Sequence, residues 1–237
     1  MEDGKSILLK GIKALCKSDG EIKRLIAPRS EEIISILEKY INEIKFFNPA
    51  YGLVGTNDQN ELIIKHILDS LAPLGIIFRL LAETETAERP QIADAGSGAG
   101  LPGIPLAIAL PACDFTLIER MGRRTNFLWN TKAALGISNI IIEENELEQT
   151  EGGRFSLVTF RAFNPLEPKL LKTLFSACAP GGVIAAYKGR REKIEEEMAP
   201  LGDRCGKWEA LPCPVPFLEE ERHLLVIRTA EIQPIAI

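Results

Sequence analysis

The spacing of the apolar residues changes near residue 90 of the chain. Before that point the apolar residues recur at helical spacing and predict one face of an amphipathic helix that begins at an N-cap, Ser30; they are Ile34, Leu37, Ile41 and Ile44. A loop is expected over 46–58, where Asn48-Pro49 and Gly52 interrupt the pattern, and a second helix over 59–71. We expect residues 1–72 to form a helical extension that packs on a main domain of residues 73–237.

After residue 90 short apolar runs alternate with helical segments. Strands are predicted around 92 and 115 and over 140–142, 156–160, 183–187, 208–211 and 223–228. Helices are predicted from 102 and over 123–135, 167–177 and 191–198. This alternation is typical of an α/β fold with a mostly parallel sheet, helices on both faces and an antiparallel hairpin at its end.

A glycine-rich loop follows the first predicted strand, in the run Asp94-Ala95-Gly96-Ser97-Gly98-Ala99-Gly100-Leu101-Pro102-Gly103. Alternating glycines let the backbone turn tightly and let a ligand lie directly against it. Pro102 suits the first position of the helix that follows. Strand, glycine loop and helix are the opening of a nucleotide-binding unit, whose ligand binds outside the carboxyl ends of the strands.

The acidic residues beside the glycine loop favour one kind of nucleotide as its ligand. The match of residues 98–103 to GxGxxG is weak by itself, and Asp94 would repel the pyrophosphate that a nicotinamide dehydrogenase binds there. Asp94 suits a cationic ligand, and S-adenosylmethionine (AdoMet) carries an ammonium and a sulfonium. Glu119 ends the second strand, where a carboxylate can hold ribose hydroxyls. An ordinary α/β turn with solvated acids is the alternative.

At these residues the chain resembles the bacterial small-subunit rRNA (guanine-N7) methyltransferases, the RsmG or glucose-inhibited division protein B family. The likeness lies in the glycine-loop run continued through Ile104-Pro105-Leu106 and in further stretches between about 46 and 227: Asn48-Pro49-Ala50-Tyr51-Gly52-Leu53, His66-Ile67-Leu68-Asp69-Ser70, Arg161-Ala162-Phe163, Lys188-Gly189 and Glu221-Arg222-His223-Leu224. The resemblance implies a Rossmann-like class I AdoMet-dependent methyltransferase sheet with N-terminal helices. It also implies methylation of N7 of one guanine in the 16S rRNA of the 30S subunit.

The cofactor-binding residues expected from the loops and the resemblance are Asp94, Gly96, Gly98, Leu101, Glu119, Leu147, Glu148 and Arg161. Gly96 and Leu101 should frame the methionine end of AdoMet, and Leu147 with Glu148 the adenine edge. This chain has Glu146 where the family usually has arginine. The acidic run over 143–151 can equally be an exposed helix start.

Five residues are candidates for contact with the substrate: Arg161, Arg123, Lys188, Arg190 and His66. Two stretches, 119–132 and 187–193, each carry a net charge of +3 and follow strands, so we expect both at the edge where the methyl emerges. Solvated helix faces are the plain alternative for these cations. Arg161 can instead pair with Asp94 or another acid, and His66 can simply bond a neighbouring loop.

No side chain is assigned as a catalytic acid or base, because guanine N7 already presents a lone pair. Adenine-N6 enzymes carry Asn/Asp-Pro-Pro-aromatic after the fourth strand, and Asn164-Pro165-Leu166 lacks the second proline and the aromatic residue. Cytosine-C5 chemistry needs a placed cysteine nucleophile, and Cys178 lies at the end of a helix.

Composition further limits the partners, the compartment and the functions that we expect for this chain. The net charge of −5 disfavours a protein that coats nucleic acid non-specifically, but local basic patches on an acidic chain suit a selective contact with RNA, and no DNA partner is expected. Five cysteines without CxxC spacing suggest a reduced, cytoplasmic chain without a metal site. The sequence lacks an apolar run long enough for a membrane span, and we expect a monomer. The alternatives are another RNA or small-molecule methyltransferase, or a non-catalytic AdoMet-binding protein linked to division.

Overall fold

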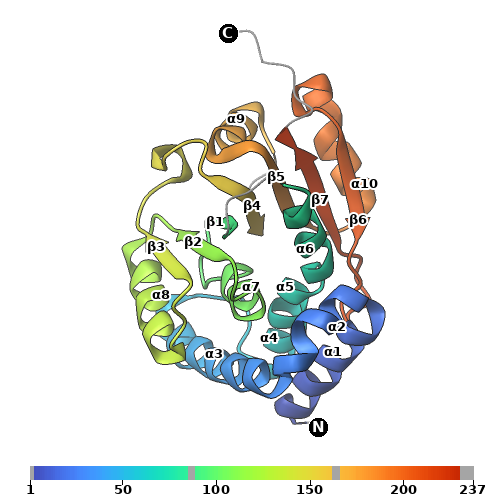
Figure 1. Cartoon of the computed structure of the whole chain (residues 1–237). Helices are drawn as coiled ribbons and strands as arrows, with labels where there is room; N and C mark the ends of the chain where they lie inside the picture. Colours follow the sequence, from blue (N-terminus) through green and yellow to red (C-terminus); the bar gives the residue numbers. More distant parts are fainter. Residues whose placement is uncertain (1–2, 85–88, 162–165, 230–237) are drawn as a thin grey trace.

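A seven-stranded sheet runs through the protein, in the order β3-β2-β1-β4-β5-β7-β6 (Figure 1). The computed structural model describes residues 3–84, 89–161 and 166–229. Its strands are β1 (Gln91–Ala95), β2 (Asp114–Ile118), β3 (Ile140–Glu143), β4 (Phe155–Arg161), β5 (Cys178–Lys188), β6 (Trp208–Pro212) and β7 (His223–Arg228). The first five strands are mutually parallel, and β7 is antiparallel to both β5 and β6. The predicted mostly parallel α/β sheet with an antiparallel end is confirmed.

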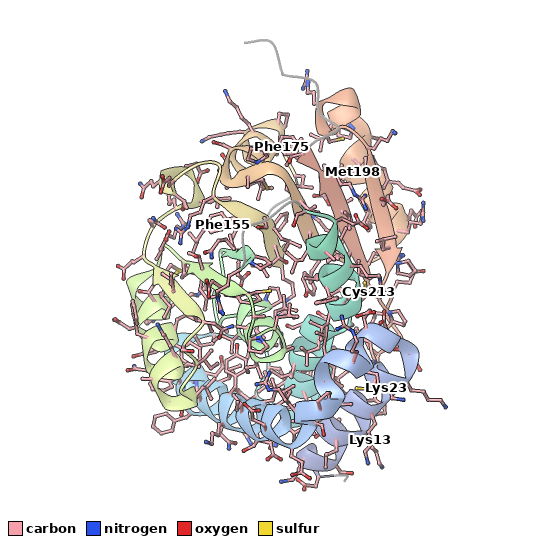
Figure 2. All side chains as sticks on the ribbon, viewed as in Figure 1. Lys13, Lys23, Phe155, Phe175, Met198 and Cys213 are labelled. Atoms are coloured by element: carbon pink, nitrogen blue, oxygen red, sulfur yellow. The ribbon has the colours of Figure 1, made fainter. Side chains whose placement is uncertain are left out.

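The two faces of the sheet bury two separate apolar clusters, because successive side chains of a strand point to opposite faces. Ile92 of β1 and Leu157 of β4 belong to the larger cluster, which contains the N-terminal helices. Their neighbours Ala93 and Val158 belong to the smaller cluster on the other face. Figure 2 labels Phe155 on the sheet side of the smaller cluster and Met198 on its helix side.

Helices cover both faces. The larger cluster is closed by α1 (Gly4–Ser18), α2 (Gly20–Ile26), α3 (Ser30–Tyr51), α4 (Gln59–Leu62), the π-helix η2 (Ile63–Leu68), α5 (Asp69–Leu71), α6 (Leu74–Glu83), α7 (Gly103–Ala109) and α8 (Gly122–Leu135). The 3₁₀ turn Ala27–Arg29 joins α2 to α3 and buries none of its residues. The smaller cluster is closed by the 3₁₀ turn η3 (Leu147–Gln149), α9 (Pro168–Ala177), α10 (Arg191–Met198) and η4 (Ala199–Cys205). In Figure 1, α1, α2 and α3 lie together at the bottom, and α9 and α10 lie at the opposite end.

The loop expected over 46–58 is wrong in its first half, because α3 continues to Tyr51 with Pro49 inside its last turns. Packing explains the extension: the ring of Phe47 lies 5.7 Å from that of Phe127 on α8 and 5.4 Å from that of Tyr51. Gly52 then ends the helix at φ 59°, and its N–H donates to the Asn48 carbonyl at 2.9 Å.

Two predicted helix starts are displaced by one residue. Ser30 is the first residue of α3 and Arg29 is its N-cap. Pro102 is the N-cap of α7, which begins at Gly103, because the Asp94 carboxylate accepts the Gly103 N–H at 2.9 Å. Such a bond satisfies one of the free donors at the helix start.

The larger cluster continues from the N-terminal helices to the sheet, across the division predicted at residue 72. That division stays a prediction. Over the ranges described, no helix has the length and apolarity needed to cross a membrane. The same ranges hold no cluster of side chains suited to a metal ion.

Candidate functional site

The glycine-rich loop joins β1 to α7 across the carboxyl ends of β1 and β2. Its glycines have φ values of 66° at Gly96, 57° at Gly98 and 87° at Gly100, which side chains other than glycine rarely adopt. The Gly96 and Ser97 N–H groups donate to the carbonyl of Ile118 at 2.9 and 3.1 Å. Gly96 is exposed and Gly98 half-buried, so the loop presents backbone at this edge of the sheet.

Asp94 is a buried carboxyl beneath this loop, with a relative exposure of 0%. Its Oδ2 accepts the Gly103 N–H, while Oδ1 is buried without a partner among the described residues. Burial raises the pKa of Asp94 to about 7, against the smaller lowering effects of the Gly103 bond and of Arg161. Burying an oxygen without a hydrogen-bond partner costs free energy. This site therefore fits a ligand group that donates a hydrogen bond to Asp94 or carries positive charge.

Glu119 lies one residue beyond β2 and is almost fully buried. Its Oε2 accepts the Gly98 N–H at 2.9 Å and its Oε1 accepts the Met121 N–H at 2.9 Å. A carboxylate oxygen has a second lone pair, so both oxygens can still accept hydroxyl groups. The carboxylate thus joins the glycine loop to the start of α8.

The segment after β3 is a short 3₁₀ turn, and the expected exposed helix start is absent from this described stretch. Leu147 is buried in the smaller cluster, whereas Glu148 is exposed. Glu146, which replaces the family's arginine, lies 3.5 Å from Arg120 in an exposed ion pair. Asn145 has a buried Oδ1 without a partner in the described part, and sequence reasoning missed it. Its only local signal is its place directly after Glu144 at the end of a strand.

Arg161 ends β4 and binds the N-terminal helices. Its Nη1 donates to the Lys65 carbonyl at 3.0 Å and to Asp69 Oδ2 at 3.1 Å, and its Nη2 donates to His66 Nδ1 at 2.8 Å. Arg222 holds the other Asp69 oxygen at 3.2 Å. Of the alternatives stated for Arg161, an ion pair with an acid is therefore present, and that acid is Asp69 rather than Asp94. These contacts bring three stretches of the family resemblance together.

His66 is held neutral in this cluster. Burial and, to a smaller extent, the charge of the neighbouring Arg161 guanidinium together lower the pKa of His66 to about 4. Burial also raises the pKa of Asp69, and Arg161 and Arg222 oppose that shift.

Two buried tyrosines, which sequence reasoning also missed, connect the extension to the site. The Tyr40 hydroxyl of α3 donates to the carbonyl of Ala99 in the glycine loop at 2.7 Å. The Tyr187 hydroxyl of β5 donates to the Ser70 carbonyl at 2.7 Å. The N-terminal helices are thus bonded to the glycine loop and to strand β5.

The basic candidates divide into two groups. Arg123, at the start of α8, and Arg190, the N-cap of α10, are exposed. Lys188 is instead only 13% exposed and pairs with Glu197 at 2.7 Å. Of the stretches named above, 162–165 lies outside the described residues, so the structure places neither Ala162-Phe163 nor Asn164-Pro165.

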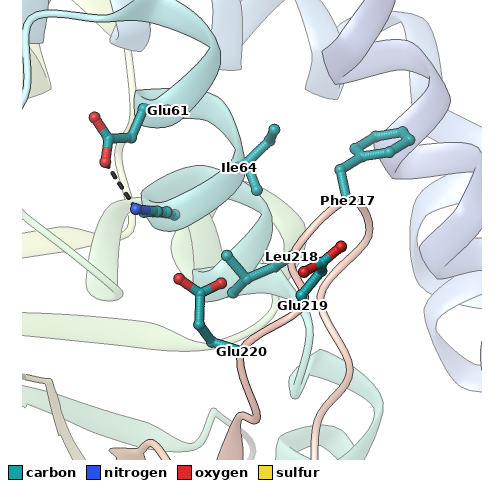
Figure 3. Close-up of a pocket in the computed structure, with 7 residues that line it drawn as sticks. Glu61, Ile64, Phe217, Leu218, Glu219 and Glu220 are labelled. Atoms are coloured by element: carbon teal, nitrogen blue, oxygen red, sulfur yellow. Dashed lines mark hydrogen bonds and ion pairs between the residues drawn. The ribbon is translucent and has the colours of Figure 1, made fainter.

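A groove opens beside the helical segment that carries His66, between this segment and the loop from β6 to β7 (Figure 3). It is lined by Glu61, Ile64, Lys65, Phe217, Leu218, Glu219 and Glu220. Glu61 pairs with Lys65 at 2.9 Å, which leaves two glutamates facing the groove. Carboxylates repel phosphate, so this groove is unsuited to an RNA backbone.

Comparison with known proteins shows which protein family the chain matches. A family model described as GidB, rRNA small subunit methyltransferase G, matches residues 33–225. The ribosomal RNA small subunit methyltransferase G of Treponema denticola is 38% identical, with 93% of each chain covered. That of Cellvibrio japonicus is 32% identical, with 98% of this chain and 100% of the relative covered.

Solved structures show the fold. The tRNA (m1A58) methyltransferase TrmI from Aquifex aeolicus is 11% identical, with a TM-score of 0.51 over 66% of this chain and 68% of that one. A SAM-dependent methyltransferase from Aquifex aeolicus is 13% identical, with a TM-score of 0.51 over 73% of this chain and 94% of that one.

Proposed function

The chain belongs to the rRNA small subunit methyltransferase G family, and we propose that it transfers the methyl group of AdoMet to N7 of one guanine in 16S rRNA. The observation that supports this most directly is the buried Asp94 Oδ1 beneath a glycine loop in which Gly96 is exposed. An anionic pyrophosphate would be repelled there, whereas the positive charge of AdoMet is favoured.

Each part of the proposed cofactor site has a distinct task. Gly96 and Gly98 let the ligand approach the backbone, and Leu101 borders the methionine end. Asp94 offers a carboxylate oxygen, and Glu119 offers lone pairs to the ribose hydroxyls. The backbone at Leu147 and Glu148 borders the adenine. When bound, AdoMet supplies an electrophilic methyl group on its sulfonium.

The reaction at guanine N7 removes no proton before the methyl transfer, because the N7 lone pair attacks directly. The protein then has to orient the base and exclude water. A neutral His66 and an Arg161 guanidinium held by three hydrogen bonds at the end of β4 are consistent with a site that positions its substrate without ionising it.

The decisive experiment compares 16S rRNA from a deletion strain and its parent by mass spectrometry. The deletion should remove one N7-methylguanine, and purified protein with labelled AdoMet should restore it on 30S particles. An unchanged content of N7-methylguanine would show that the assignment is wrong. Methylation of other RNAs or small molecules alone would indicate a different transferase, and no AdoMet binding by calorimetry would indicate a non-catalytic protein.

AdoMet affinity is expected to rise with pH through about 7. The pKa of Asp94 in the folded protein is raised to about 7, so its carboxyl is increasingly protonated below that pH. If the ionised form binds the cationic ligand, affinity falls about tenfold for each pH unit below 7. Calorimetry between pH 5.5 and 7.5 measures this slope, and Asp94→Asn should flatten it. The ligand-free protein should show the opposite trend, with stability falling from about pH 4 to 7, because the folded state binds the extra proton.

Arg123→Ala and Arg190→Ala are each expected to lower methylation of 30S particles and to flatten its salt dependence without altering AdoMet affinity. Each exposed guanidinium that contacts a phosphate releases a counterion, so its removal should reduce the salt slope by about one. Lys13→Ala, on α1 (Figure 2), is the matched control because this exposed cation lies away from the strand ends. Lys188→Ala should instead lower stability, because the half-buried Glu197 carboxylate would lose its ion pair with Lys188. Normal methylation by both arginine variants at every salt concentration would leave these cations as solvated faces.

A further inference from the structure

The protonation state of His66 is defined by its partner. A guanidinium has five N–H donors and no acceptor, so the 2.8 Å contact from Arg161 Nη2 requires a lone pair on His66 Nδ1. A neutral imidazole with an unprotonated Nδ1 carries its proton on Nε2. The depressed pKa of His66, about 4, agrees with this geometry. His66 is therefore a single-donor group at Nε2 throughout the neutral pH range.

Arg161 is itself held in place, so the tautomer of His66 is built into the fold. Its Nη1 donates to both the Lys65 carbonyl and Asp69, and Arg222 fixes the second Asp69 oxygen. Arg161 uses three of its five N–H groups in these bonds and in the bond to His66. The segment Ile63–Leu68 is a π-helix, a departure from regular helix that is frequent at functional sites.

The Nε2–H of His66 has no acceptor among the residues that the structure describes, and the side chain is only half-buried. It lies beside Arg161 at the carboxyl end of β4, next to β1, whose Asp94 underlies the glycine loop. This donor is thus available at the edge of the sheet where the proposed methyl transfer takes place.

We propose, on the basis of guanine-N7 methylation as proposed above, that His66 is a positioning and specificity-determining residue whose Nε2–H donates to O6 of the target guanine. Guanine presents N7 and O6 side by side as acceptors, whereas adenine presents an amino group in place of O6. A lone donor at O6 therefore accepts guanine and disfavours adenine.

A neutral single donor also leaves the N7 lone pair of guanine free, which an arginine at this place would not do. Arginine commonly recognises guanine by bonding O6 and N7 together. Such a bond would occupy the N7 lone pair that has to attack the methyl group. In this structure the guanidinium of Arg161 is turned toward the extension, and the imidazole that it orients supplies one donor and leaves N7 free.

The test combines a protein change with a change of the base. 30S particles are reconstituted with guanine or 2-aminopurine at the target position, since 2-aminopurine keeps N7 and lacks O6. The wild type should prefer guanine by about 10- to 100-fold in kcat/KM, the range of one good base contact. His66→Phe should lose the same factor on guanine and almost nothing further on 2-aminopurine. His66→Gln, whose amide can accept from Arg161 and donate to O6, should recover part of the preference.

The outcomes separate this proposal from the one on which it rests. Failure of the wild type to methylate N7 of guanine in unmodified particles would refute the proposed function itself. If the wild type methylates guanine but the losses from His66→Phe and from 2-aminopurine are independent, His66 does not contact O6. Unchanged AdoMet affinity and an unchanged unfolding midpoint exclude misfolding. If His66→Phe does not fold, nitrogen-15 NMR of the wild-type imidazole decides: a proton on Nδ1 between pH 6 and 8 would overturn the inference.

Discussion

Gly98→Ala is expected to weaken AdoMet binding by about 3 kcal/mol, or about 150-fold, the upper end of the cost of forcing a methyl group into a filled site. In the ligand-free protein the added Cβ has room, because its nearest neighbours are Arg124 Nη1 and the Gly96 carbonyl oxygen, both at 3.9 Å. The methyl group therefore enters the space in which we place the cofactor. Folding should lose only about 1–2 kcal/mol, the cost of the left-handed backbone at this position.

Gly100→Ala is the matched control, two residues further along the same loop. Its Cβ would lie 2.4 Å from Ile104 Cδ1 and 3.1 Å from Leu128 Cδ2, both of which are buried side chains. We expect this variant to lose more stability than Gly98→Ala and to retain AdoMet affinity in its folded fraction. Calorimetry and thermal unfolding measure the two quantities separately. Normal binding by Gly98→Ala would show that the loop does not form the cofactor site.

Local signals predicted the elements whose ends are marked in the sequence. The helix Arg191–Met198 and the strand His223–Arg228 lie where their patterns placed them. Gly136 ends α8 at φ 66°, directly after residue 135, where the predicted helix stops. The loop predicted from Asn48-Pro49 is wrong because that signal is local, whereas the edge-to-face contact of Phe47 with Phe127 depends on a helix about 80 residues away.

The geometry of the candidate cofactor site was predictable only where a sequence motif defines it. Asp94 and the glycines follow from the strand-loop-helix pattern, and Glu119 follows from the next strand. The pairing of Arg161 with Asp69 joins residues 92 positions apart, and the bond from Tyr40 to Ala99 spans 59. The spacing of apolar residues along the chain carries no information on such long-range pairings. The contacts of the N-terminal helices with the candidate site are therefore known only from the structure.

Arg161→Ala is expected to lower the free energy of unfolding by about 3–5 kcal/mol, the usual result of removing one partner of a buried ion pair. Asp69 is only 5% exposed and would retain Arg222 alone as its charged partner. The Lys65 carbonyl and His66 Nδ1 would lose their donor at the same time. The pKa of Asp69, already raised by burial, should rise further without the opposing Arg161 charge. Denaturant unfolding at pH 7 measures the loss.

Arg161→Ala combined with Asp69→Asn separates the stability of this cluster from its function. The neutral amide no longer needs a charged partner, and Arg222, at 26% side-chain exposure, can be solvated when the carboxylate is gone. The double variant should therefore be more stable than Arg161→Ala, since the two residues act as one unit. Methylation should remain low, because His66 Nδ1 still lacks the donor that keeps the proton on Nε2. Recovery of methylation together with stability would show that Arg161 has no role beyond holding the extension to the sheet.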